Sequence, residues 1–171
     1  MDGVATQLLA NFLVEKRFDV AVCELSDEQS AALSHNQFLE RHDFRSTTPP
    51  GTRSYAAVVG YPDTKAEVVP GTTLVETPIF SMANLVQREE LGRIFIAFDK
   101  KRVTNVETRR QFTAPDPYGM SGGAIFTIPV DLMAMANSPA RLAGIATHWR
   151  RGRRVFEGAT IERCRRGVGR N

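Results

Sequence analysis

Apolar residues in this chain fall in short stretches separated by turn signals, and most stretches are too short for helices. Residues 55–60 form a continuous apolar run that ends at a Tyr-Pro-Asp turn, and residues 18–25 alternate apolar with mixed positions. Both are predicted as strands. β-Branched and aromatic residues predict further strands at 65–69, 72–77, 93–98, 102–106, 124–130 and 142–147. Many short strands at such spacing predict an all-β barrel or sandwich.

The remaining segments carry weaker signals. Ser26-x-x-Gln29 ahead of two alanines is typical of a short helix start, while residues 7–14 suit either a helical turn or a strand. Residues 47–51 contain two prolines and a glycine and are predicted as a loop. Asp99-Lys-Lys101 is expected to be the turn of a hairpin, and a second turn is expected at Arg150–Arg154, followed by a strand and a short basic helix.

Composition adds the class of protein. The chain has 171 residues, 42% hydrophobic and 24% charged, which is typical of a globular domain. No apolar run approaches the roughly 20 residues of a membrane-spanning helix, and residues 8–14 lack the features of a signal peptide. We therefore expect no membrane partner and no export, and a cytoplasmic chain as it stands, although its localisation is unknown. Cys23 and Cys164 have neither metal-ligand nor redox spacing, so free thiols, no metal and no cofactor are expected.

The positive charge is concentrated near the C-terminus. The net charge is +3, and residues 150–171 hold eight arginines against two glutamates. Clustered arginines attract phosphates by counterion release, but charge alone supports only non-specific attraction, and few aromatic residues are interleaved with these arginines. Nucleic acid is therefore not the expected partner.

The candidate chemistry lies in the segment Pro-Asp-Pro-Tyr-Gly-Met-Ser-Gly-Gly-Ala-Ile-Phe, residues 115–126. Its glycines could simply supply the positive φ angles of a turn. Gly119-Met-Ser121-Gly-Gly123 also satisfies the G-x-S-x-G pattern of α/β-hydrolases, with Asp131 and His148 following in the order of that fold. That elbow needs a strand before the serine and a helix after it, whereas prolines precede Ser121 and strand-forming residues follow it.

A third interpretation treats the backbone N–H groups of Gly119 and Ser121 as donors that converge on an oxyanion. Here the chain resembles the trypsin-like, chymotrypsin-fold serine peptidases of bacterial type. The resemblance is carried by Gly119-Met-Ser-Gly-Gly-Ala-Ile-Phe126, Leu142-Ala-Gly-Ile-Ala-Thr147, Phe18-Asp-Val-Ala-Val-Cys-Glu-Leu25 and Tyr55-Ala-Ala-Val-Val-Gly-Tyr-Pro62. Their order and spacing agree with the family from about residue 18 to residue 161.

The resemblance implies a role for each matching residue. Ser121 would be the nucleophile, and Asp19 the carboxylate that orients an imidazole in the family's triad. Gly119 and Ser121 would form the oxyanion hole, and Thr147 would lie on the strand that binds the substrate backbone by β-addition. His148 and Asp116 would lie near the substrate side chain, though His148 is two residues out of register with a histidine used by glutamate-selective relatives. The expected partner is a polypeptide substrate or a peptide ligand.

Two positions depart from the family pattern. Met120 stands where digestive members have an aspartate that pairs with a new N-terminus, so no such activation switch is expected. No histidine precedes Asp19, and His35 and His42, which follow it, lie in polar stretches typical of surface residues. A serine hydroxyl without an adjacent base is a poor nucleophile, so very little peptidase activity is predicted.

The resulting expectation is an all-β, chymotrypsin-like double barrel with an incomplete first barrel, residues 1–50, and a second barrel with a basic C-terminal segment and short helix, residues 51–171. The missing base suggests that the chain begins partway through a peptidase. The alternative function is a non-catalytic peptide-binding or interaction module on the same scaffold.

Overall fold

The structure is a computed structural model that describes residues 12–33, 39–44, 54–71, 73, 75–105, 108–128 and 140–168. Its strands are β1 (Leu13–Glu15), β2 (Val20–Val22), β3 (Tyr55–Gly60), β4 (Glu67–Val68), β5 (Val75–Glu76), β6 (Phe80–Glu90), β7 (Arg93–Ala97), β8 (Val103–Thr104), β9 (Gln111–Phe112), β10 (Ala124–Ile128), β11 (Arg141–Arg150) and β12 (Val155–Thr160). The described helices are α1 (Asp27–Ala32) and α3 (Ile161–Val168), with 3-10 turns η1 (Arg41–Asp43), η2 (Asp63–Lys65), η3 (Lys100–Arg102) and η4 (Arg151–Arg153). The predicted all-β class is confirmed.

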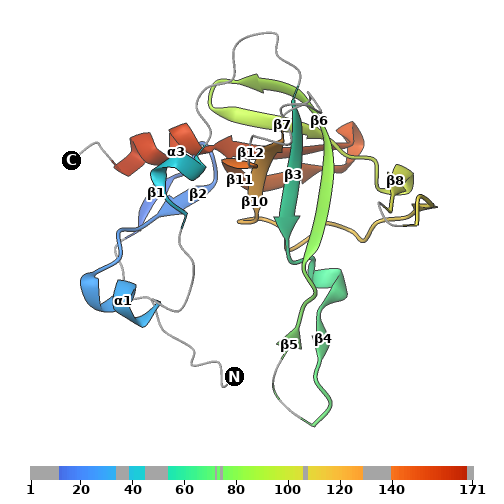
Figure 1. The fold of residues 1–171 in the computed structure, drawn as a ribbon, viewed down its shortest axis with the longest axis horizontal. Helices are drawn as coiled ribbons and strands as arrows, with labels where there is room; N and C mark the ends of the chain where they lie inside the picture. The colour runs from blue at the N-terminus through green and yellow to red at the C-terminus, as the bar shows by residue number, and fades with distance from the viewer. Residues whose placement is uncertain are drawn as a thin grey trace.

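Six strands close into a barrel in the order β10-β11-β12-β7-β6-β3, and all neighbouring strands are antiparallel (Figure 1). Closure gives each barrel strand a neighbour on both sides, although β6 pairs with β3 along its first half and with β7 along its second, and β11 extends beyond the start of β10. The β4–β5 hairpin extends away from the barrel, and β8–β9 forms a separate two-stranded sheet.

The barrel core is built from one contiguous set of apolar side chains. It comprises Ala56, Val58, Met82, Ile94, Ile96, Phe98, Ala114, Met120, Ile125, Ala143, Ala146 and Phe156. Two glycines allow β11 and β12 to approach closely: a Cβ at Gly144 would overlap the Ala159 carbonyl, and one at Gly158 would overlap the Ile145 carbonyl. These contacts explain why small residues interrupt two otherwise strand-forming segments.

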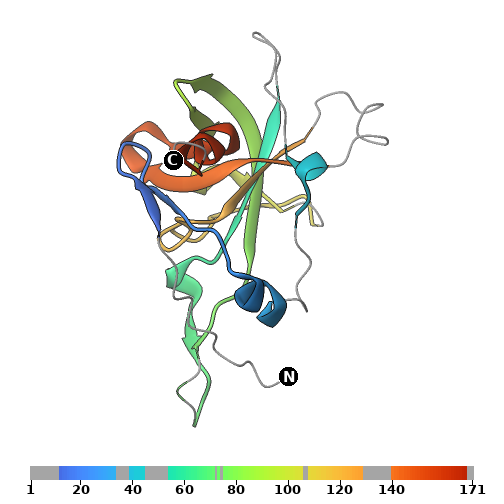
Figure 2. The same ribbon diagram turned by 90° about the vertical axis from the view of Figure 1, so that its left-hand side faces the viewer.

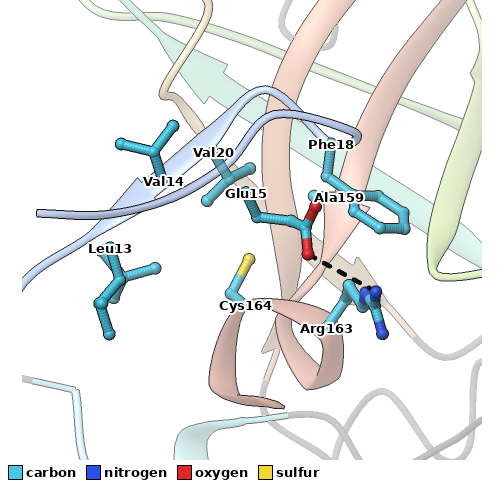
Figure 3. A pocket seen from close by; sticks show the side chains of 9 residues that line it. Leu13, Val14, Glu15, Phe18, Val20, Ala159, Arg163 and Cys164 are labelled. Atoms are coloured by element: carbon cyan, nitrogen blue, oxygen red, sulfur yellow. Dashed lines mark ion pairs between the residues drawn. The ribbon is translucent and has the colours of Figure 1, made fainter. Parts of the chain in front are cut away.

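The β1–β2 hairpin lies outside the barrel and packs beside α3, as both views show (Figures 1 and 2). Phe18, at the hairpin turn, is 4% exposed and has three guanidinium groups around its ring, those of Arg17, Arg93 and Arg163, at 4.9 to 5.6 Å from its centroid. Hairpin and helix line a cavity of about 190 Å³ whose walls are mostly apolar (Figure 3). The hairpin is therefore attached through side chains rather than through backbone pairing.

One titratable side chain with a shifted pKa, the thiol of Cys164, lines this cavity. Glu15 on β1 pairs with Arg163 on α3 at 3.6 Å, and Cys164 points into the cavity beside them (Figure 3). Burial raises the pKa of the Cys164 thiol, a shift that a backbone hydrogen bond partly offsets. Both cysteines are free thiols, as expected.

Several sequence predictions are confirmed at the level of single elements. The strand at 55–60 is β3 with the same bounds, and Ser26 caps α1 through a capping box with Gln29. The turn at residues 150–154 contains η4 and is followed by β12 and α3. The strand predicted at 18–25 is shorter, because residues 16–19 form the hairpin turn that precedes β2. The loop predicted at 47–51 lies outside the described residues.

Two predictions about strands are wrong. Residues 93–98 and 102–106 do not form a hairpin: β7 pairs with β6 and β12, β8 pairs with β9, and η3 separates them, with Asp99 capping the turn. The longest strand, β6, was not predicted, because Ser81, Asn84 and Gln87 interrupt its apolar pattern. β6 tolerates these residues because its pairing with β7 shifts register between Val86 and Arg88, and much of its length faces solvent.

No helix within the described residues is long and apolar enough to cross a bilayer.

Candidate active site

The serine loop is a tight glycine turn that leads directly into a strand. Gly119 and Gly122 have φ angles of 86° and 87°, a conformation that favours glycine, and Ser121 lies between them on the exposed surface. β10 begins at Ala124, so a strand rather than a helix follows the serine. This arrangement excludes the α/β-hydrolase elbow, which requires a helix after the nucleophile.

The buried side chain of Met120 attaches the serine loop to the barrel core. Its side chain is 1% exposed, and the methionine packs against Gly60 at the end of β3. Its amide donates to the Pro117 carbonyl at 3.2 Å, and its carbonyl accepts from the Gly123 amide at 3.0 Å. An apolar residue at position 120 thus has a packing role.

β11 holds the other side of the serine loop. The amide of Gly122 donates to the Ala146 carbonyl and the amide of Ala146 donates to the Gly123 carbonyl, both at 2.8 Å. The hydroxyl of Ser121 donates to the Thr147 carbonyl at 3.1 Å. The Thr147 side chain points the other way and donates to the Glu157 carbonyl of β12 at 3.2 Å. Ser121 is therefore fixed against the backbone of the strand predicted to bind substrate.

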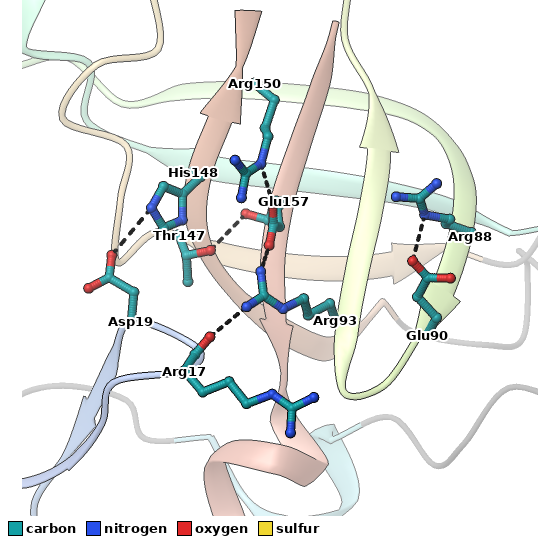
Figure 4. Close-up of polar contacts among 9 residues, drawn as sticks. All are labelled: Arg17, Asp19, Arg88, Glu90, Arg93, Thr147, His148, Arg150 and Glu157. Carbon is teal, nitrogen blue, oxygen red and sulfur yellow. Dashed lines mark hydrogen bonds and ion pairs between the residues drawn. The ribbon is translucent and has the colours of Figure 1, made fainter. Parts of the chain in front are cut away.

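Asp19 reaches the same strand one residue further on. It lies at the β1–β2 turn with a φ of 55°, and its Oδ2 is 3.9 Å from Nε2 of His148 (Figure 4). Both side chains are well exposed, 66% for Asp19 and 49% for His148. Asp19 and Ser121 therefore contact consecutive residues of β11, His148 and Thr147. The contact between Asp19 and His148 was not predicted, because no local pattern links a turn to a strand so distant in sequence.

A buried carboxylate supports this part of β11. Glu157, directly opposite His148 in the β11–β12 register, is 1% exposed. It pairs with Arg150 at 2.6 Å and also with Arg93, which donates in addition to the Arg17 carbonyl of the hairpin turn (Figure 4). Arg93 thus connects the hairpin that carries Asp19 to the barrel strand that carries Glu157.

Asp63 is a residue of this site that the sequence did not reveal. A Cβ at Gly119 would overlap the Asp63 carboxylate, so only glycine fits there, and the Asp63 amide donates to the Tyr118 carbonyl at 2.8 Å. The carboxylate lies against the loop whose amides were predicted to bind an oxyanion. A negative charge at this position opposes a second negative charge nearby. The pairing of residue 63 with residue 119 depends on tertiary contact, so the sequence offers no signal for it.

Asp116, predicted near the substrate side chain, lies in the segment that precedes the serine loop. Its carboxylate pairs with Lys100 at 2.7 Å, and its carbonyl accepts from the Thr64 hydroxyl at 3.2 Å. Its charge is thus matched by Lys100 within the protein. Tyr118 then packs edge-on against Trp149, with ring centroids 6.0 Å apart.

No histidine is bonded to Ser121 among the described residues. His42 lies in η1 with Glu40 and Asp43 as its ionic neighbours, at 3.4 and 3.5 Å. His148 contacts Asp19, and His35 and Asp131 lie outside the described residues. No cluster of three metal-ligating side chains occurs in the described ranges either.

Comparison of the chain with protein-family models, curated proteins and solved structures gives no match.

Proposed function

We propose that this chain carries the nucleophile and oxyanion loop of a chymotrypsin-like serine peptidase, with acyl transfer on Ser121. One observation carries the proposal: Ser121 and Asp19, far apart in sequence, both contact β11 at the consecutive residues Thr147 and His148. The closed six-stranded barrel is compatible with the second barrel of that fold, and the β1–β2 hairpin with a remnant of the first. On this proposal the substrate is a polypeptide.

The chemistry would follow the acyl-enzyme route. Ser121 Oγ would attack the scissile carbonyl, and the amides of Gly119 and Ser121 would stabilise the resulting oxyanion. The hydroxyl proton must pass to a base and then to the leaving amine, after which water releases the acyl group. In the described residues that hydroxyl donates to a carbonyl, which is not a base. General-base catalysis typically contributes about 10² to 10⁴ in rate, so turnover by this chain is expected to be very slow.

A fluorophosphonate probe tests the proposal without requiring turnover. Adducts are located by peptide mass spectrometry, with Ser81 on β6 as an internal control serine. We expect slow labelling, at least about tenfold faster at Ser121 than at Ser81, because only the serine loop supplies oxyanion donors. Ser121→Ala should abolish the adduct. Equal labelling at both serines would overturn the proposal, and rapid labelling would contradict the predicted lack of a base.

Asp63 permits a sharper form of the same test. Asp63→Asn removes the negative charge beside Gly119 and keeps the side-chain shape, so labelling of Ser121 should rise about three- to tenfold. Glu67→Gln on β4 is the matched control, since Glu67 is exposed and lies on the hairpin that extends from the barrel. A rise in both variants would indicate a general charge effect rather than an effect at the oxyanion loop.

A second candidate function is peptide binding without hydrolysis. β11 extends beyond the start of β10, so residues 148–150 pair with β12 on one side and with no described strand on the other. An open strand edge can pair with an extended peptide. The Ser121 hydroxyl bonded to a backbone carbonyl favours this function, because such a hydroxyl is not activated. Binding of fluorescent casein to the Ser121→Ala variant, with the casein left intact by the unmodified protein over a day, would favour the second candidate over the first.

A further inference from the structure

Two basic turns lie side by side at the end of the barrel opposite α3 (Figure 1). One is η3, Lys100–Arg102, which follows β7, and the other is η4 with its flanking residues, Arg150–Arg154. β7 and β12 pair through Ala97 and Val155, and the Phe98 amide donates to the Arg154 carbonyl at 2.8 Å. Backbone pairing therefore fixes the two turns next to each other.

The β8–β9 hairpin adds two more arginines at the same end. It starts directly after η3, and its turn is closed by the Asn105 amide, which donates to the Arg110 carbonyl at 2.9 Å. The Ala114 amide donates to the Lys100 carbonyl at 2.8 Å and ties the returning strand to η3. We call the resulting surface the basic end, which consists of Lys100, Lys101, Arg102, Arg109, Arg110, Arg150, Arg151, Arg153 and Arg154.

Most of this charge is not neutralised within the protein. Asp99 pairs with Arg154 at 2.9 Å and approaches Arg102 at 4.0 Å, while Asp116 and Glu157 pair with Lys100 and Arg150. The other five cations are exposed and form no ion pair with any carboxylate in the described part of the chain: Lys101, Arg109, Arg110, Arg151 and Arg153. Like charges held together in this way attract a polyanion strongly.

The structure also divides the arginine-rich tail in a way that the sequence does not show. Arg163 on α3 is engaged with Glu15 and Phe18 at the opposite end of the barrel. Arg150–Arg154 is instead joined by cations from residues 100–110. The basic end is therefore assembled by tertiary structure from three segments.

A groove beside the basic end contains aromatic residues. It lies between the first half of β6 and the β8–β9 hairpin and has a volume of about 550 Å³. Arg102 and Asn105 line it together with Phe80 and Phe112, and the Phe112 side chain is 38% exposed. Exposed aromatic rings next to cations are typical of surfaces on which unpaired bases stack.

We propose that the basic end and this groove bind single-stranded nucleic acid without sequence specificity. Phosphates would lie along the three basic turns, and a base would enter the groove at Phe112. None of the three turns presents a helix or long ribbon of the kind that enters the major groove of a duplex, which favours a single strand. An acidic protein would match the charge but would not use the Phe112 ring. The proposal does not depend on the chemistry of Ser121.

Fluorescence anisotropy provides the test, with a labelled oligothymidylate of about 20 nucleotides, a duplex of equal length and an oligoglutamate peptide as probes. We expect the single strand to bind more tightly than either other probe at about 50 mM NaCl, and its affinity to fall steeply as salt is raised. No detectable binding at low salt, or tighter binding of the duplex or of oligoglutamate, would overturn the proposal.

Matched variants locate the surface. Arg151→Glu/Arg153→Glu should weaken single-strand binding at least about tenfold. Lys16→Glu/Lys65→Glu makes the same change in net charge at exposed positions outside the basic end and should weaken it less than about threefold. Lys101→Glu/Arg110→Glu repeats the test at the other two segments if the first double variant does not fold. Equal losses in the basic-end and control variants would overturn the assignment.

Phe112→Ala separates stacking from charge. It should lower single-strand affinity about fivefold, as expected for loss of one base stack, while leaving the salt dependence and the duplex affinity unchanged. If Phe112→Ala bound the single strand as tightly as the unmodified protein, the groove would not be part of the binding surface, and the proposed preference for a single strand would be overturned.

Discussion

The barrel and the β1–β2 hairpin differ in how their backbone is satisfied. Each of the six barrel strands has a neighbour on both sides, whereas β1 and β2 pair only with each other among the described residues. A two-stranded hairpin is marginally stable by itself in water, so this one depends on its contacts with α3 and Arg93. Close packing should therefore determine the free energy of unfolding of the barrel. A few side-chain contacts should determine whether the carboxylate of Asp19 stays beside β11.

The largest expected effect comes from disturbing barrel packing. Gly144→Ala would place a Cβ against the Ala159 carbonyl of β12, and a backbone atom cannot move aside as a flexible side chain can. We expect a loss of about 3 kcal/mol in the free energy of unfolding, measured by urea denaturation. Gly152→Ala is the control, because nothing lies within 4 Å of its Cβ, and it should be nearly neutral. Equal effects would show that closure of the barrel does not require this approach.

A somewhat smaller effect is expected at the link between the two regions. Glu157→Gln leaves Arg93 and Arg150 without their carboxylate, and because both arginines are partly exposed we expect a loss of about 2 kcal/mol rather than the full cost of a broken buried pair. Amide exchange should also accelerate in the hairpin, since Arg93 holds the Arg17 carbonyl.

Glu90→Gln is the control for that experiment. Glu90 pairs with Arg88 at 3.1 Å, but both side chains are about half exposed, so its loss should change stability by less than about 0.5 kcal/mol. If the two glutamate variants were equally stable, the buried carboxylate would not connect the hairpin to the barrel.

The same difference explains what the sequence could predict. In the barrel, β3 and the turn before β12 were predictable because local signals and tertiary pairing agree there. β6 was missed because its pairing partners, not its own pattern, make it a strand. For the candidate site, the glycine turn around Ser121 could be predicted from residue type, but the contacts of Asp63 with Gly119 and of Asp19 with His148 could not. Such contacts arise only when distant segments are folded together.

Loosening the hairpin without harming the barrel should give a still smaller change in global stability. Phe18→Ala removes the ring that fills the space among Arg17, Arg93 and Arg163. Replacing a core phenylalanine by alanine typically lowers the free energy of unfolding by about 3 to 5 kcal/mol. Here the loss cannot exceed the small free energy that holds the hairpin in place, so we expect a loss of about 1 kcal/mol in urea denaturation.

The rate at which the Cys164 thiol is alkylated measures the loosening of the hairpin directly. Burial raises the pKa of this thiol, so little thiolate is present near pH 8 and alkylation is slow. Opening the cavity in Phe18→Ala lowers the pKa toward its ordinary value and admits reagent, and alkylation should accelerate about tenfold. Phe112→Ala, at the other end of the barrel, should leave the rate unchanged. An unchanged rate in Phe18→Ala would mean that the hairpin stays closed without its aromatic anchor.

The smallest effect is expected in α1. Ser26→Ala removes one hydrogen bond of the capping box, the one that the Gln29 amide donates to the Ser26 hydroxyl at 3.2 Å. The backbone amide of residue 26, which donates to the Gln29 side chain at 2.9 Å, is retained. We expect α1 to lose about 1 kcal/mol locally, seen as faster amide exchange at Gln29 and Ser30. No residue of α1 is buried, so the global free energy of unfolding, measured by urea denaturation, should change by less than about 0.3 kcal/mol. Ser30→Ala, inside the helix, should instead slow exchange, since alanine favours helix. A global loss as large as the local one would mean that α1 unfolds together with the barrel, and the two would then be one cooperative unit.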